Sequence, residues 1–313
     1  MRTPRDLYEI VDHVGQMLRE RSANHRVGPV LIVALKGFVD AGHVCATGVE
    51  HLLRDNNATR FVTFDHDALV DYRSKRPVMA FDSNRWTDYD EPELVIDLVQ
   101  DQEGSDFLLL HGQEPDLSWN AFTSALLELI DEFSISMVVS CYGIPMGVPH
   151  TRPLSVTLHA TNEALIGEES GWMGKIQVPG SVQNLLEYRM GLVGRDAVGI
   201  AVHVPHYLAQ SHYPPAAVLG LSRIEDITGL NFDVAELSNQ SEEILVEVTR
   251  QIEASPEAQE MVSALERQYD SFVEANQSSS LLAVNTPMPT AEELGAEFEK
   301  FLAQQDGPDK NQN

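Results

Sequence analysis

Residues 29–54 read PVLIVALKGFVDAGHVCATGVEHLLR, and this stretch decides the fold. The apolar run at residues 30–35 is too short to cross a membrane and is rich in β-formers, which predicts a buried central strand. A tight loop with a glycine at each end, residues 37–42, follows it, and apolar residues then recur at helical spacing. Strand, glycine loop and helix form the first unit of an open α/β sheet, in which such loops line the ligand crevice.

The rest of the chain continues this alternation. Thr3-Pro4 is predicted to open a helix through about residue 20. Further strands are predicted at residues 60–65, 93–100, 106–111, 136–141, 156–160 and 196–204. This order predicts an α/β fold with a mostly parallel, helix-covered sheet. The polar residues 66–92 are typical of a functional loop or a hairpin insertion.

The character of the chain changes near residue 234, where long acidic helical patterns begin. We therefore expect an α/β domain over residues 1–233 and a C-terminal helical extension over residues 234–276. A linker and a short terminal helix should occupy residues 277–313. The apolar faces of residues 261–273 and 294–302 are larger than a peripheral helix pair needs, which favours a homo-oligomer.

Composition limits the partners and the compartment. The formal net charge is −27, so the surface should repel nucleic acid and anionic membranes, and neither is an expected partner. Acidic residues among the first 20 argue against a signal peptide, and no apolar run reaches the about 20 residues of a membrane helix. Cys45 and Cys141 lie in apolar segments that indicate buried thiols. We therefore expect a cytoplasmic protein.

The loop at residues 37–42 has two readings. Backbone amides at the start of the following helix could hold an anionic ligand. Alternatively, Asp40 caps that helix and the loop is only a tight turn. The loop lacks the spacing of dinucleotide-binding and phosphate-binding loops, so the sequence alone leaves both readings open.

Two other groups of residues are weaker candidates, one for a metal site and one for a catalytic thiol. The spacing of His203, His206 and His212 matches no standard zinc pattern, so no metal and no cofactor are expected. Cys141 and His150 could form a thiol–base pair, but a proline-rich loop separates them, and a buried core cysteine is the favoured interpretation. No catalytic set is identified.

The carboxyl ends of the predicted strands offer a candidate ligand site instead. Four loops there carry glycine or polar residues, and ligands of open parallel sheets bind at this edge. We predict one shared crevice in which Arg152 could bind an anionic group and the carboxylates beside it stay charged. The candidates are Gly37, Asp40, Gly42, Glu114, His150, Arg152 and His206.

Three of these segments carry a family resemblance: GFVDAG at residues 37–42, GQEP at residues 112–115 and GIPMGVPHTRP at residues 143–153. In this order the chain resembles the proteasome assembly chaperone 2 family, in its larger actinobacterial-type branch, over roughly residues 28–240. The resemblance implies an α/β fold similar to nucleoside phosphorylases and peptidyl hydrolases, a tendency to self-associate, and no agreed catalytic residues.

Eukaryotic members of that family are scaffolds that help to assemble proteasome α-rings. The resemblance therefore implies a scaffold or binding protein without catalytic activity, with itself or another protein as partner. The alternative is a small-molecule enzyme of phosphorylase-like or hydrolase-like fold that uses the strand-end crevice. Assembly chaperones often dock on proteasomes through a hydrophobic-tyrosine ending. This chain ends in GPDKNQN, so proteasome docking is not expected.

Overall fold

The computed structural model describes residues 3–24, 28–54, 58–167 and 175–278. It divides into two units, Met1–Glu266 and Arg267–Asn313, and the sheet belongs to the first. The linker and terminal helix predicted for residues 277–313 fall outside the described residues, apart from the end of α8 (Pro256–Ser278). The domain boundaries drawn from the sequence remain predictions.

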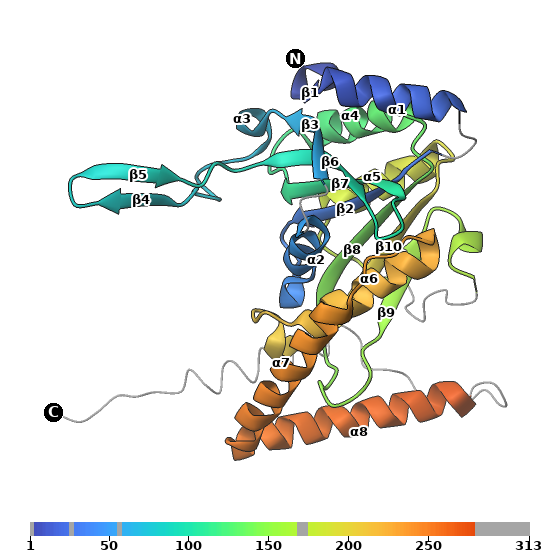
Figure 1. Ribbon diagram of the computed structural model, residues 1–313. Helices are drawn as coiled ribbons and strands as arrows, with labels where there is room; N and C mark the ends of the chain where they lie inside the picture. Colours follow the sequence, from blue (N-terminus) through green and yellow to red (C-terminus); the bar gives the residue numbers. More distant parts are fainter. Residues whose placement is uncertain (1–2, 25–27, 55–57, 168–174, 279–313) are drawn as a thin grey trace. The chain divides into compact units, whose positions relative to one another are not determined.

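One eight-stranded sheet organises the first unit (Figure 1). Its central strands β7, β2, β8 and β10 run parallel, while the strands on both flanks pair antiparallel. The predicted helix-covered α/β sheet is confirmed, with its parallel part in the centre. In spatial order the strands are β1 (Tyr8–Ile10), β3 (Ala58–Phe64), β6 (Leu94–Gln100), β7 (Asp106–Gln113), β2 (Val30–Lys36), β8 (Met137–Met146), β10 (Ala197–Pro205) and β9 (Val156–Ala160).

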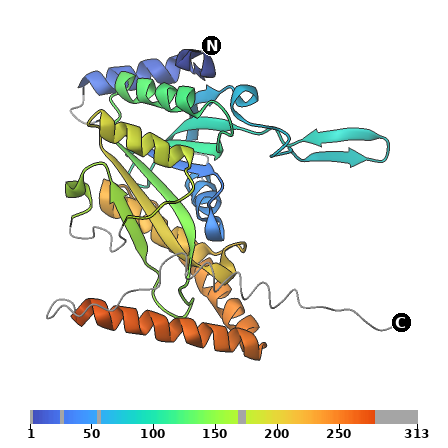
Figure 2. The same cartoon turned by 180° about the vertical axis from the view of Figure 1, so that it is seen from behind.

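Two apolar cores lie on opposite faces of this sheet, because alternate residues of each buried strand point to opposite sides. One core packs under α1 (Asp12–Asn24), α4 (Trp119–Glu132) and α5 (Val182–Leu192), which Figure 2 shows in front. The other packs under α2 (Val44–Leu53), α6 (Pro214–Thr228) and α7 (Ala235–Glu253). Both faces are therefore covered, as the apolar runs of the central strands require.

The N-terminal segment differs from the sequence-based expectation. Thr3 precedes only a short 3-10 helix, η1 (Pro4–Leu7), and β1 follows before α1 begins. β1 pairs antiparallel with β3 and forms the edge of the sheet. Leu7 and Tyr8 are thereby buried in the first core, so tertiary pairing overrides the local helical pattern here.

Residues 66–92 contain a short helix, α3 (His66–Leu69), and a two-stranded hairpin formed by β4 (Met79–Asp82) and β5 (Arg85–Tyr89). We call this hairpin the β4–β5 arm. It extends away from the main sheet of the first unit, and every residue of both strands is exposed (Figure 1). Of the two alternatives predicted for residues 66–92, the structure shows the hairpin insertion.

A small apolar hollow under α2 offers a stability test. It is lined by Cys45, Gly48, Cys141 and Leu221 among others, and it has room for about one water molecule. A Cβ atom at Gly48 would meet only Leu221 Cδ2, at 4.0 Å. We expect Gly48→Ala to raise the free energy of unfolding by about 1 kcal/mol, because alanine favours the helix interior. Urea denaturation measures this change.

Gly220→Ala is the matched control, since Gly220 lies on α6, which packs against the same core. A Cβ atom there would stand 2.6 Å from Cys141 Sγ, so this variant should be less stable than the wild type. If Gly48→Ala also lowers stability, the space beside Gly48 is not available to a methyl group.

Candidate functional site

The four predicted loops follow parallel strands β2, β7, β8 and β10, so they lie along the same edge of the sheet (Figure 1). Backbone contacts join them in pairs. Gly42 N–H donates to Ala209 O at 2.9 Å, and Tyr213 N–H donates to Gly42 O at 3.1 Å. Gly143 lies so close to Ala41 that a Cβ atom on it would stand 2.0 Å from the Ala41 oxygen. The glycines of these loops therefore serve close backbone approach.

Asp40 caps α2. One carboxylate oxygen accepts from Cys45 N–H at 2.8 Å, and the other accepts from Ala46 N–H at 3.4 Å. These amides lie in the first turn of the helix, where no intrahelical acceptor is available. Burial raises the pKa of Asp40, and the two hydrogen bonds offset part of that shift. The structure thus shows the capping role that the sequence left as one of two readings.

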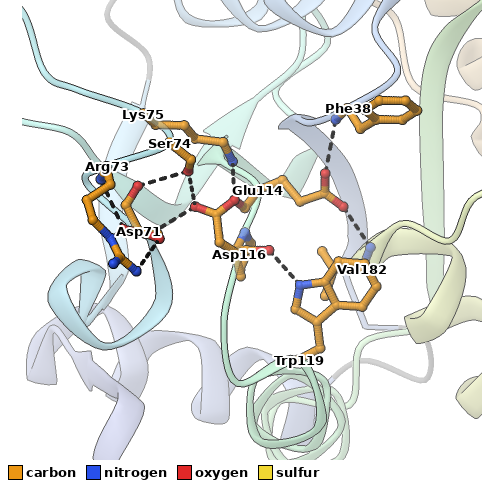
Figure 3. Close-up of polar contacts among 10 residues, drawn as sticks. Phe38, Asp71, Arg73, Ser74, Lys75, Glu114, Asp116, Trp119 and Val182 are labelled. Carbon is orange, nitrogen blue, oxygen red and sulfur yellow. Dashed lines mark hydrogen bonds and ion pairs between the residues drawn. The ribbon is translucent and has the colours of Figure 1, made fainter.

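Glu114 is buried at 7% exposure and connects two elements (Figure 3). Its Oε2 accepts from Phe38 N–H at 3.1 Å, and its Oε1 accepts from Val182 N–H at 2.7 Å, at the start of α5. Gly37 is required beside it, because a Cβ atom there would stand 2.4 Å from Glu114 Oε2. The carboxylate therefore ties the loop after β2 to a helix on one face of the sheet.

The turn that carries Glu114 also holds the base of the β4–β5 arm (Figure 3). Lys75 Nζ donates to Glu114 O at 2.7 Å and pairs with Asp116 at 3.4 Å. Asp71 N–H and the Ser74 hydroxyl both donate to Asp116 Oδ2, at 2.9 and 3.2 Å. These contacts fix residues 71–75, from which the arm continues, against the edge of the sheet.

His150 and His206 meet at Tyr207, at the end of β10. The Tyr207 hydroxyl accepts from His150 N–H at 2.8 Å and forms a second hydrogen bond with His150 Nδ1 at 2.7 Å. The ring of His206, the first residue of η4 (His206–Leu208), lies 5.4 Å from the Tyr207 ring. Burial lowers the pKa of His150 and raises that of Tyr207 to about 12, so a neutral histidine and tyrosine are favoured at pH 7.

Arg152 forms an ion pair with Glu266 of α8 at 3.3 Å, and the neighbouring Thr151 hydroxyl donates to the same carboxylate. Asp40, Glu114 and Arg152 therefore each have partners on a different element. In the structure His150 and His206 both contact Tyr207, and Gly37 lies beside Glu114. A single crevice that includes all seven candidates stays a prediction. Two small hollows of about 20 Å³ each lie in the described part of the chain, and none of the seven candidates lines either of them.

A second polar group lies on the face of the sheet under α5, and the sequence analysis missed it. Tyr142 of β8 hydrogen-bonds His159 Nε2 of β9 at 3.0 Å, and His159 Nδ1 lies 2.8 Å from Glu187 Oε1 of α5. Burial raises the pKa of Tyr142 to about 12. With Gln183 and Asn184 of the same helix, we call these residues the α5 cluster. The signal in the sequence was the polar residues at alternate positions 155, 157, 159 and 161, which indicate a polar face on β9.

His203 of β10 belongs to the same face of the sheet. It is 3% exposed, and its two ring nitrogens lie 2.9 Å from the Ser155 hydroxyl and 2.8 Å from the Thr157 hydroxyl. Burial lowers its pKa to about 4, which keeps the ring neutral at pH 7. Among the described residues, no group of three or more His, Cys, Asp or Glu side chains is placed to hold a metal ion. Within the same residues, no helix is long and apolar enough to cross a membrane.

Comparisons with known proteins agree on one family. The sequence matches the model described as PAC2 family over residues 34–252. A Mycobacterium tuberculosis protein of unknown function is 42% identical with a TM-score of 0.77, and the match covers 80% of this chain and 87% of that one. A protein of unknown function from Corynebacterium glutamicum is 36% identical with a TM-score of 0.78, covering 86% and 98%.

A third solved structure carries a functional description. The proteasome-assembly chaperone homologue of Mycobacterium tuberculosis is 28% identical with a TM-score of 0.68, and the match covers 74% of this chain and 99% of that one. No curated protein gives a significant match.

Proposed function

Because the chain belongs to the PAC2 family, as its strand-end motifs predicted, we propose that it is a cytoplasmic, non-catalytic scaffold whose β4–β5 arm binds a second copy of the same chain. The relationship to a proteasome-assembly chaperone homologue supports a role in holding protein chains together. The strand-end loops support the non-catalytic part, because the carboxylates of Glu114 and Asp40 are already bound to backbone amides.

The arm has two chemically different faces, and this observation carries the proposal. Met79 pairs with Tyr89, and Phe81 pairs with Trp86 across the strands, so these four side chains share one face. A register shift between the two pairs keeps them on that side. The Phe81 and Trp86 rings pack edge to face with centroids 5.0 Å apart. The opposite face carries Ala80, Asp82, Arg85 and Asp88.

The apolar face of the arm is not covered by the described part of its own chain. Phe81 is 58% exposed and Trp86 is 63% exposed. An isolated two-stranded hairpin is at best marginally stable in water, and exposed aromatic clusters of this kind mark binding surfaces. The contacts of residues 71–75 with Asp116 and Glu114 fix the base of the arm, so its apolar face stays accessible to another molecule.

A second copy is the favoured partner because the chain also offers a surface that could receive the arm. Tyr188, Leu192 and Val193, on α5 and just after it, are each at least 60% exposed. An arm from one copy placed on this patch of the next would cover both apolar surfaces at once. Such a head-to-tail contact forms a ring when the rotation between copies closes, and an open filament when it does not.

The double variant Phe81→Ser/Trp86→Ser tests this proposal. Each aromatic anchor of an interface contributes about 2 kcal/mol or more, so removing two should weaken self-association by roughly a thousandfold. Light scattering after gel filtration and native mass spectrometry should show an oligomer for the wild type and a monomer for the variant. Asp88→Ser, on the polar face of the same arm, should leave the oligomer intact. A wild-type monomer, or an unchanged oligomer in the double variant, would contradict the proposal.

A further inference from the structure

Hydrogen bonds in the α5 cluster connect three elements, β8, β9 and α5. The Glu187 carboxylate can only accept, so His159 Nδ1 carries a proton and donates a hydrogen bond to Glu187 Oε1. His159 Nε2, on the other side of the ring, forms a hydrogen bond with the Tyr142 hydroxyl at 3.0 Å. Hydrogen bonds therefore link Tyr142 through His159 to the Glu187 carboxylate.

The position of the His159 ring depends on a glycine. The ring lies directly over Gly199 of β10, where an added Cβ atom would stand 1.9 Å from His159 Cε1 and 2.4 Å from Nε2. Only glycine leaves this space on the sheet free. The side chain of His159 is 34% exposed, so the cluster is open to the surface on this side.

Three buried oxygens of the cluster have no hydrogen-bond partner: Gln183 Oε1, Asn184 Oδ1 and the second carboxylate oxygen of Glu187, Oε2. Gln183 and Glu187 are one helical turn apart, and Asn184 is three residues from Glu187, so all three lie toward one side of α5. Gln183 as a whole is only 8% exposed. A buried oxygen without a hydrogen-bond donor destabilises the protein, so a bound group that donates N–H hydrogen bonds to these oxygens would be favoured.

We propose that the α5 cluster binds the ammonium group of a small primary amine, with the oxygens of Gln183, Asn184 and Glu187 as acceptors. A primary ammonium ion carries three N–H donors and one positive charge, which matches three oxygens and one carboxylate. A water molecule has only two donors and brings no charge. This site is independent of the arm, so a failure of either proposal leaves the other standing.

Binding of methylammonium chloride to the full chain tests the site. We expect saturable binding at one site per chain by calorimetry, together with a shift of the His159 ring ¹⁵N resonances. Tetramethylammonium chloride has the same charge and no N–H donor, so at equal ionic strength it should give neither effect. This comparison separates the site from general attraction to an acidic surface.

Two variants sharpen the result. Glu187→Gln keeps an acceptor for His159 but removes the charge, and it should weaken methylammonium binding at least tenfold. The matched control is Glu163→Gln, because Glu163 is an exposed glutamate of η3 (Glu163–Leu165), and its binding should equal that of the wild type.

Gln183→Met provides a second readout that needs no ligand. It removes one unpartnered buried oxygen at similar volume, so the melting temperature without amine should rise while amine affinity falls. The side-chain amides of Gln183 and Asn184 could instead turn and donate to Glu187 Oε2. In that case no saturable amine binding appears and Gln183→Met lowers the melting temperature, and either result overturns the proposal. Equal binding of tetramethylammonium would do the same.

Discussion

Glu114→Ala is expected to lower the free energy of unfolding by about 3–6 kcal/mol. Hydrogen bonds to a charged group each contribute about 1.5–3 kcal/mol, and Glu114 accepts two of them, from Phe38 and Val182. Alanine offers no acceptor, so the buried Val182 amide at the start of α5 loses its partner. The loop after β2 loses its tie at the same time. Urea denaturation followed by circular dichroism measures the change.

Two further substitutions separate this role from the general loss of a carboxylate. Glu93→Ala removes a glutamate that is 54% exposed and pairs with Arg60, and it should cost less than about 1 kcal/mol. Glu114→Gln keeps one oxygen acceptor and places an amide nitrogen against the other backbone N–H, so its stability should lie between those of Glu114→Ala and the wild type. A Glu114→Ala protein within 1 kcal/mol of the wild type would show that the two amides find other acceptors.

The opening unit could be predicted because its signals are local. The apolar run, the loop with Gly37 and Gly42, and the helical spacing after it all lie within 26 residues of chain, 29–54, and β2 and α2 form where they indicated. The capping role of Asp40 was one of two readings for the same reason, since its partners Cys45 and Ala46 follow closely in the sequence. Local chemistry decides such elements.

The partners of Glu114, His150 and Arg152 could not be predicted, because each depends on strand order. Glu114 meets Val182 only because α5 begins beside the end of β7, 68 residues further along the chain. Arg152 pairs with Glu266, 114 residues away. A sequence shows that such residues lie at strand ends, but the distance between two loops is set by the position of their strands in the sheet.

The α5 cluster and the arm illustrate two further limits. His159 takes its place through the absence of a side chain at Gly199, and a glycine in a strand gives no hint of which ring will cover it. The single apolar face of the arm depends on a register shift between Ala80 and Phe81, which changes the side on which the β5 residues point. Neither feature is visible from residue spacing alone.

His203 makes the free energy of unfolding depend on pH, and the direction of that dependence follows from its lowered pKa. The ring is buried between Ser155 and Thr157, and burial lowers its pKa to about 4 from an ordinary value of 6.5. As the pH falls below 6.5, the His203 ring therefore becomes protonated in the unfolded state but stays neutral in the folded state until the pH approaches 4. The stability linked to His203 is fully present above pH 6.5 and is lost as the pH falls toward 4.

We therefore expect the wild type to lose about 3 kcal/mol of unfolding free energy through His203 between pH 6.5 and pH 4, since each pKa unit corresponds to about 1.36 kcal/mol. His203→Gln removes the titrating ring and keeps groups that can hydrogen-bond Ser155 and Thr157. The His203→Gln variant should be modestly less stable than the wild type at pH 7.5. Its unfolding free energy should fall less steeply in acid, so the two curves of unfolding free energy against pH converge or cross as the pH falls. Other titrating groups are shared by both proteins and cancel in this comparison. Parallel curves from pH 7.5 to pH 4, or a His203 ring that titrates near 6.5 by NMR, would show that the ring takes its proton freely in the folded protein.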